Sequence, residues 1–179
     1  MFFVLVLADS VYASENDLNL DLTKATITYE DYEIIVGSFG NDPEIAKQIE
    51  ESLTSVTSEE QSLVTPVDQS LITPFKTVTG AGGKVTIDAG TSGRIIYWSV
   101  TPATSWPWIF TGDIQLRYYS GYKRDAAIVG AGGLGSSASG YVTMKKNNGG
   151  IATLVGTAYS TDNKNYKVMP GASVPFRAN

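Results

Sequence analysis

The chain contains neither cysteine nor histidine, and these two absences exclude several kinds of chemistry. Without cysteine there is no disulfide framework, so the folded form depends on its hydrophobic core alone. A zinc site built from Cys and His, a Ser–His–Asp triad, a Cys–His dyad and a histidine pH switch are excluded as well. We therefore expect neither a metal site nor a bound cofactor.

Glutamate is absent from residues 76–179, which narrows the options for catalysis further. A glycosidase that uses two carboxylates would have to draw on the aspartates of this region, and their spacing in the sequence pairs none of them. These aspartates are Asp88, Asp113, Asp125 and Asp162. An enzyme is therefore the function that the sequence favours least.

The sequence also lacks an apolar run of the roughly 20 residues that a transmembrane helix needs. Its apolar start ends in Val11-Tyr12-Ala13, which has the small residues that signal peptidase prefers, although a basic beginning is missing. We interpret residues 1–13 as a truncated signal peptide, with a buried N-terminal strand as the alternative. The first interpretation predicts a secreted bacterial protein, free outside the cell or attached to a cell surface.

Acidic and basic residues are sorted into different parts of the chain. Residues 1–75 hold fourteen Asp and Glu against two Lys, a net charge of −12, whereas residues 76–179 hold eleven Lys and Arg against four Asp, a net charge of +7. We divide the first part into an acidic segment at 14–57 and a linker rich in Ser, Thr and Pro at 58–75. The reversal of sign predicts a basic surface for an anionic partner, or for the chain's own acidic segment.

One amphipathic helix is predicted in the acidic segment, near residues 43–55. Asp42 is a suitable N-cap, and Pro43 suits the first helical position. Apolar residues then recur every three or four positions, at Ile45, Ile49, Leu53 and Val56. Residues 26–39 alternate in part and predict a strand or a short hairpin.

Residues 76–179 have the pattern of an all-β domain. Apolar and polar residues alternate in short runs, as at Ile96, Trp98 and Val100, and glycine-rich turns separate the runs. About seven or eight short strands predict an antiparallel β-sandwich, Ig-like or jelly-roll-like. The sequence Asn147-Asn148-Gly149-Gly150 is predicted to be a hairpin turn between two neighbouring strands.

A glycine-rich motif, Gly130-Ala131-Gly132-Gly133-Leu134-Gly135, follows an apolar stretch. It resembles the nucleotide-binding loop of Rossmann enzymes, and of adenylyltransferases related to ubiquitin-activating enzymes, in which such a loop implies phosphate bound at a helix N-terminus. Residues 136–144 have no helical apolar stripe, however, and too little chain follows for a doubly wound sheet. Because Gly80-Ala81-Gly82-Gly83 repeats the first tetrapeptide, we interpret residues 130–135 as a flexible turn.

Aromatic and basic residues in predicted turns are the best candidates for a ligand site. Exposed rings could stack on sugars or enter a lipid interface, and the cations beside them could attract an anion. The alternative is that the two tryptophans of the group lie beneath their loop, since Trp is usually buried. The predicted contact residues are Trp106, Trp108, Tyr119, Tyr122, Lys123 and Arg124.

Three functions remain open. The first is a secreted, non-catalytic binding module for an anionic or glycan ligand at a cell surface or in the extracellular matrix, with a polysaccharide, teichoic acid or an anionic membrane as partner. The second is a membrane-active, toxin-like or bacteriocin-like protein whose acidic segment acts as a masking pro-region. The third is a structural or partner-binding protein in which the acidic and basic parts contact each other. No nucleic acid partner is expected, because no recognition motif is present.

Overall fold

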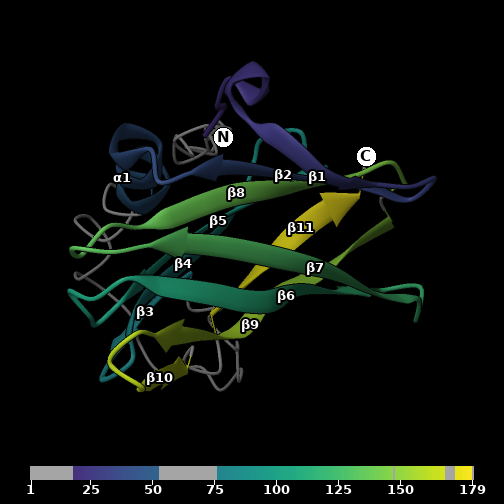
Figure 1. Cartoon of the computed structure of the whole chain (residues 1–179). Coiled ribbons are helices and arrows are strands. Elements are labelled where there is room, and N and C mark those ends of the chain that lie inside the picture. The colour runs from purple at the N-terminus through teal and green to yellow at the C-terminus, as the bar shows by residue number, and fades with distance from the viewer. Residues whose placement is uncertain (1–17, 53–75, 147, 168–171, 179) are drawn as a thin grey trace, which may run out of the picture.

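The computed structural model describes residues 18–52, 76–146, 148–167 and 172–178. These residues form two antiparallel sheets, one α-helix, α1 (Pro43–Glu51), and a short 3-10 helix, η1 (Leu22–Lys24). The prediction of a mainly β fold is therefore confirmed (Figure 1). Neither helix in these ranges is long and apolar enough to cross a membrane. The predicted signal peptide at 1–13 and linker at 58–75 lie outside the described residues.

The first sheet has six strands within the described ranges. In spatial order they are β1 (Thr26–Glu30), β2 (Ile34–Gly40), β8 (Ala138–Met144), β5 (Ile95–Pro102), β4 (Gly83–Ala89) and β3 (Thr77–Gly80). Strand β2, from the acidic segment, pairs with β8, so that Ile34 lies opposite Met144. The six-stranded sheet therefore contains strands from both the acidic segment and the basic part of the chain (Figure 1).

The second sheet has five strands in the described part of the chain. Their order is β10 (Asn165–Lys167), β9 (Asn148–Ser160), β6 (Trp108–Tyr118) and β7 (Lys123–Gly132), and β11 (Ser173–Ala178) pairs with β9 beside β10. From residue 76 onward the described residues thus contain nine strands, where seven or eight were expected. The additional strand is β3, whose four residues are too few to show an alternating pattern.

A hydrophobic core lies between the two sheets. Trp98 and Ile96 enter it from the six-stranded sheet, and Phe110, Ile114 and Leu116 enter it from the five-stranded sheet. All five side chains occupy the apolar positions of alternating runs, because successive residues of a strand point to opposite faces. The alternation in the sequence therefore predicted this core correctly.

A second, smaller core lies on the outer face of the six-stranded sheet. Tyr97 and Tyr141 point outward from β5 and β8, and Ile45 and Ile49 of α1 pack against them. The Asp42 side chain accepts hydrogen bonds from the first turn of α1, as predicted. The helix ends at Glu51, short of the predicted residue 55; Leu53 and Val56 lie outside the described residues.

Two glycine-rich segments differ from their predictions. Gly130 and Gly132 belong to β7 and pair with Phe110 and Trp108, so the expected flexible turn is strand at these positions. A Cβ at Gly130 would stand 2.6 Å from Cβ of Ala138, and one at Gly132 would stand 2.6 Å from the Trp108 ring. Glycine occurs there because the backbone lies close to its neighbours.

The second difference concerns the hairpin turn predicted at residues 147–150. Of these, residues 148–150 are described and belong to β9, and the connection from β8 to β9 does not join paired strands. Strand β8 pairs with β2 and β5, whereas β9 pairs with β6, β10 and β11, so this connection passes from one sheet to the other. Gly150 lies against β6, where an added Cβ would stand 2.4 Å from the Arg117 carbonyl oxygen. Gly150 therefore reflects close packing of β9 on β6, whereas Gly149 has a φ of 71°, in the left-handed region that favours glycine.

Candidate functional site

The six predicted ligand contacts lie at opposite ends of β6. Trp106 and Trp108 are at its beginning, and the other four residues are in or after the turn that joins β6 to β7. The eleven residues of β6 span about 33 Å, because a strand rises about 3.3 Å per residue. The structure therefore does not bring the six residues together in one site.

The two tryptophans have different environments. Trp108 is only 2% exposed and belongs to the core between the sheets, so it is not accessible to a ligand from solvent. Trp108 lies two residues before Phe110 and six before Ile114, and residues an even number apart in a strand point to the same face, so it points inward. Trp106 precedes the strand and is 60% exposed. Of this pair, only Trp106 can meet a ligand.

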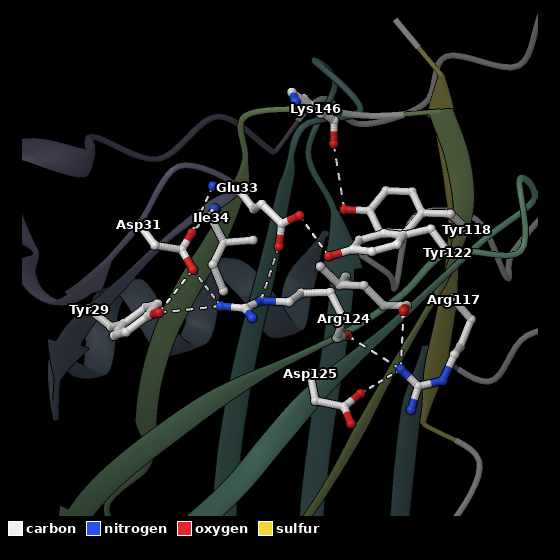
Figure 2. Close-up of polar contacts among 11 residues, drawn as sticks. Tyr29, Asp31, Glu33, Ile34, Arg117, Tyr118, Tyr122, Arg124, Asp125 and Lys146 are labelled. Carbon is white, nitrogen blue, oxygen red and sulfur yellow. Dashed lines mark hydrogen bonds and ion pairs between the residues drawn. The ribbon is translucent and has the colours of Figure 1, made fainter.

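Arg124 is the centre of a cluster of ion pairs rather than an exposed contact (Figure 2). Its Nη2 lies 2.5 Å from Oδ2 of Asp31 and donates a second hydrogen bond to the hydroxyl of Tyr29. Its Nε lies 3.7 Å from Oε2 of Glu33. Because Asp31 and Glu33 belong to the turn between β1 and β2, a cation of the basic part is paired with two acids of the acidic part.

Tyr122 joins the same cluster from the β6–β7 turn. Its hydroxyl donates a hydrogen bond of 2.6 Å to Oε1 of Glu33, and this bond raises the pKa of Tyr122. The Tyr118 ring packs 5.6 Å from that of Tyr122. Burial, and then the charge of Glu33, raise the pKa of Tyr118 to about 12. Both tyrosines are therefore neutral hydrogen-bond donors over the physiological pH range.

Asp31 organises the acidic turn from within. Its Oδ1 accepts hydrogen bonds from the backbone N–H groups of Glu33 and Ile34, at 2.7 and 2.8 Å. The bond from Ile34 is the largest of the causes that lower the pKa of Asp31; the positive charge of Arg124 acts in the same direction. The carboxylate of Asp31 thus holds the turn in shape with one oxygen and binds Arg124 with the other.

Lys145 holds the acidic turn from the side of β8. Its Nζ lies 2.7 Å from Oε1 of Glu30 and 2.6 Å from the carbonyl oxygen of Asp31. Its backbone N–H donates to the carbonyl oxygen of Glu33. Two cations, Arg124 of β7 and Lys145 directly after β8, therefore converge on one acidic turn. We call Tyr122, Arg124, Lys145 and the acids Glu30, Asp31 and Glu33 the Arg124 cluster.

The remaining predicted contacts stay accessible beside this cluster. Tyr119 is 71% exposed at the tip of the β6–β7 turn, and Lys123 is exposed at the start of β7. Lys146, which follows Lys145, is exposed as well. None of these side chains takes part in the ion pairs of the Arg124 cluster, and Tyr119 stands with Asp88 and Phe176 around a separate cavity.

A surface that the sequence analysis missed lies on the outer face of the five-stranded sheet. Ile109 is directly opposite Tyr159 on one side and Ala131 on the other, and all three side chains are exposed. Leu134 joins this end of the sheet, because its N–H donates to the carbonyl of Ser105, next to Trp106. We call the exposed residues at this end the apolar face; they are Trp106, Ile109, Val129, Leu134 and Tyr159.

Polar groups continue the same face toward the β6–β7 turn. Thr111, Asp113 and Gln115 alternate with the inward residues of β6, and Thr157 lies opposite Thr111. Burial, and then the negative charge of Asp125, raise the pKa of Asp113. This pair of aspartates gives the middle of the face an anionic character, although Arg117 binds Asp125.

A cavity of about 290 Å³ opens between β4 and β11, near the buried carboxylate of Asp88. Asp88 accepts hydrogen bonds from Ser52 Oγ and its own neighbour Ala89 N–H, and its Oδ1 lies 2.9 Å from Lys76 Nζ. These three donors occupy the carboxylate, so it offers little to a ligand. Its evident role is to fix Ser52 and Lys76 to β4.

Within the described ranges, no group of acidic side chains is arranged to hold a metal ion. A comparison with protein-family models, with curated proteins and with solved structures finds no match to this chain. The function therefore has to be argued from the two surfaces at the ends of β6.

Proposed function

We propose that the chain is a secreted, non-catalytic binding module, built on a β-sandwich of the Ig-like or jelly-roll kind, that recognises a glycan at a cell surface or in the extracellular matrix. The contact surface is the apolar face. The observation that carries this proposal is the gathering of Trp106, Ile109 and Tyr159 in exposed positions at one end of one sheet. Large apolar side chains gathered on a surface mark interaction sites more often than chance.

The chemistry of the apolar face suits a sugar chain. Aromatic rings offer flat apolar surfaces to the C–H groups of a sugar ring, and Tyr159 adds a hydroxyl group. The hydroxyl groups of Thr111 and Thr157 and the amide of Gln115 lie on the same sheet face, where they can exchange hydrogen bonds with sugar hydroxyls. Asp113 and Asp125 beside them would repel an acidic ligand, so this face favours a neutral glycan.

The state of the basic residues supports the same choice. Arg124, Lys145 and Lys84 are each paired with acids of residues 30–50, and Lys76 with Asp88. Surface cations that are already neutralised add little attraction for a distant anion. Binding through the apolar face should therefore depend weakly on salt.

Retention on immobilised neutral polysaccharides tests the proposal, with a β-glucan, a xylan and chitin as probes. Trp106→Ala and Tyr159→Ala should each weaken retention about tenfold, the upper range for loss of one aromatic contact. Tyr119→Ala is the matched control, because Tyr119 is equally exposed at the other end of β6 and should leave retention unchanged. Lack of retention on all three polysaccharides, or equal retention of the three variants, would contradict the proposal.

A second candidate, a membrane-active protein masked by its acidic segment, is favoured by one observation. Four ion pairs join residues 30–50 to the basic part of the chain, namely Arg124 with Asp31 and Glu33, Lys145 with Glu30 and Lys84 with Glu50. Dye leakage from anionic vesicles tests it with the full chain. Leakage that rises when Asp31 and Glu33 are changed to Asn and Gln would support this candidate, and absence of leakage from both forms would exclude it.

A further inference from the structure

Arg124 lies between two carboxylates, and neither carboxylate accepts hydrogen bonds from both Nε and Nη2, as a bidentate partner would. Asp31 takes Nη2, while Glu33 stands 3.7 Å from Nε, a distance beyond a hydrogen bond. The buried Nε accordingly has no hydrogen-bond partner. The guanidinium group presents Nε and Nη2 as a planar fork that matches the two oxygens of one oxyanion. The acidic turn thus fills this fork only in part.

Donors from three places converge on the same acidic turn, and Figure 2 shows two of them, Arg124 and Tyr122. Arg124 comes from β7, Tyr122 from the β6–β7 turn, and Lys145 follows β8. Each donates to a different carboxylate, of Asp31, Glu33 and Glu30 respectively. If the acids lose their charge, the two cations and the tyrosine hydroxyl lose their charged partners but still point toward the turn.

We infer that Tyr122, Arg124 and Lys145 form a binding site for an acidic polysaccharide, which the chain's own acidic turn at residues 30–33 occupies and masks. This site lies at the opposite end of β6 from the apolar face and extends the proposed function without depending on it. A polymer that carries regularly spaced oxyanions can present successive charges to Arg124 and Lys145, as Asp31 and Glu30 do in this structure.

The residues around the cluster favour a polysaccharide over a lipid surface. The exposed rings beside it are tyrosines, namely Tyr29, which contacts Asp31 and Arg124, and Tyr32, which follows Asp31 in the turn. A tyrosine can stack on a sugar ring and exchange hydrogen bonds with sugar hydroxyls. Tyrosine also occurs at the headgroup level of membranes, but entry into the acyl region needs exposed aliphatic, Trp or Phe side chains. Ile27, on the outer strand β1, is the exposed aliphatic residue nearest in sequence to the turn.

Chromatography of the full-length protein on immobilised heparin, a sulfated polysaccharide, tests the inference. The variant Asp31→Asn/Glu33→Gln keeps the hydrogen-bond acceptors of the turn and removes the two charges that face Arg124, while Glu30 stays paired with Lys145. It should bind about tenfold more tightly than the unmodified chain, the effect of gaining about one charge-assisted hydrogen bond. Glu44→Gln/Glu51→Gln on α1 is the matched control, with the same change of net charge at a distance from the cluster.

Two additional variants connect the effect to this site. Adding Arg124→Gln to Asp31→Asn/Glu33→Gln should lower heparin binding to the level of the α1 control, Glu44→Gln/Glu51→Gln. Glu33→Gln alone leaves the Asp31 turn bonds intact and should give an intermediate gain, which protects the test against misfolding of the double variant. Trp106→Ala should leave binding to heparin unchanged, so this result is separate from the test of the apolar face.

Three results would overturn the inference. The first is an equal gain by the α1 control, which would show a general effect of net charge. The second is a gain that survives Arg124→Gln. The third is binding of the double variant to phosphatidylglycerol vesicles without binding to heparin, which would identify a lipid surface as the partner.

Discussion

Gly37 on β2 and Tyr141 on β8 lie directly opposite each other, and the Tyr141 ring covers the glycine. A Cβ at Gly37 would stand 2.3 Å from Cε1 of that ring. The same ring belongs to the outer core beneath α1. The contact between the Gly37 backbone and the Tyr141 ring therefore joins the acidic part of the chain to the rest of the sheet.

Gly37→Ala should destabilise the fold by about 1–3 kcal/mol, the usual cost of forcing extra atoms into a packed site. Chemical denaturation monitored by circular dichroism measures the free energy of unfolding. Ile27→Ala is the control, because Ile27 pairs with Gly37 on the opposite side but is exposed, and it should change stability by less than about 0.5 kcal/mol. Equal effects of the two substitutions would contradict the packing argument.

Asp88→Asn should lower the free energy of unfolding by about 1.5–3 kcal/mol, since a buried carboxylate that binds Lys76 and Ser52 loses its charge. Asp125→Asn is the comparison, because Asp125 also binds a cation, Arg117, but is largely exposed. An exposed pair contributes less than about 1 kcal/mol. Denaturant titration measures the free energy of unfolding of both variants. A larger loss in Asp125→Asn than in Asp88→Asn would contradict the greater importance of the buried pair.

Stability should fall as the pH rises from 10 to 12, in part because of Tyr118. Its pKa is 10.0 as a reference and about 12 in the fold, so the folded state keeps the proton longer than the unfolded state does. The stabilisation is complete below pH 10 and is lost as the pH approaches 12. Tyr118→Phe should reduce this slope in pH-dependent denaturation, with Tyr119→Phe as the exposed control. An unchanged slope in Tyr118→Phe would contradict the assignment.

Iodide should quench the fluorescence of Trp106 and leave that of the other two tryptophans largely unaffected. Trp98 and Trp108 are buried between the sheets, whereas Trp106 lies in an exposed loop. Trp106→Phe should therefore remove most of the quenchable emission, and Trp108→Phe should not. Strong quenching that persists in Trp106→Phe would show that Trp108 reaches solvent.

The sequence predicted local features well where the signal itself is local. Alternating side chains identified the inward faces of β5 and β6, and Asp42 with Pro43 marked the start of α1. The same alternation also predicts that Trp108 points inward, because it lies two residues before Phe110. Its position directly after Pro107 is typical of a turn, and this local signal obscures the strand that begins at Trp108.

Pairing between distant segments could not be predicted in this way. Arg124 and Asp31 are 93 positions apart, and nothing local distinguishes this pair among thirteen basic and eighteen acidic residues. The opposite net charges of the two parts predict a contact between them, but not which side chains make it. The role of Gly130 and Gly132 could not be predicted either, because the residues that crowd them, Ala138 and Trp108, come from other strands.

The neighbouring positions of β2 and β8 impose an order on folding. More than ninety residues separate these two strands in the chain, and pairing over such distances is slow to form. Until β8 is available, β2 has only β1 as a partner, and an isolated two-stranded hairpin is marginal in water. The hairpin of β1 and β2 therefore becomes stable only when β8, which lies far along the chain, pairs with β2.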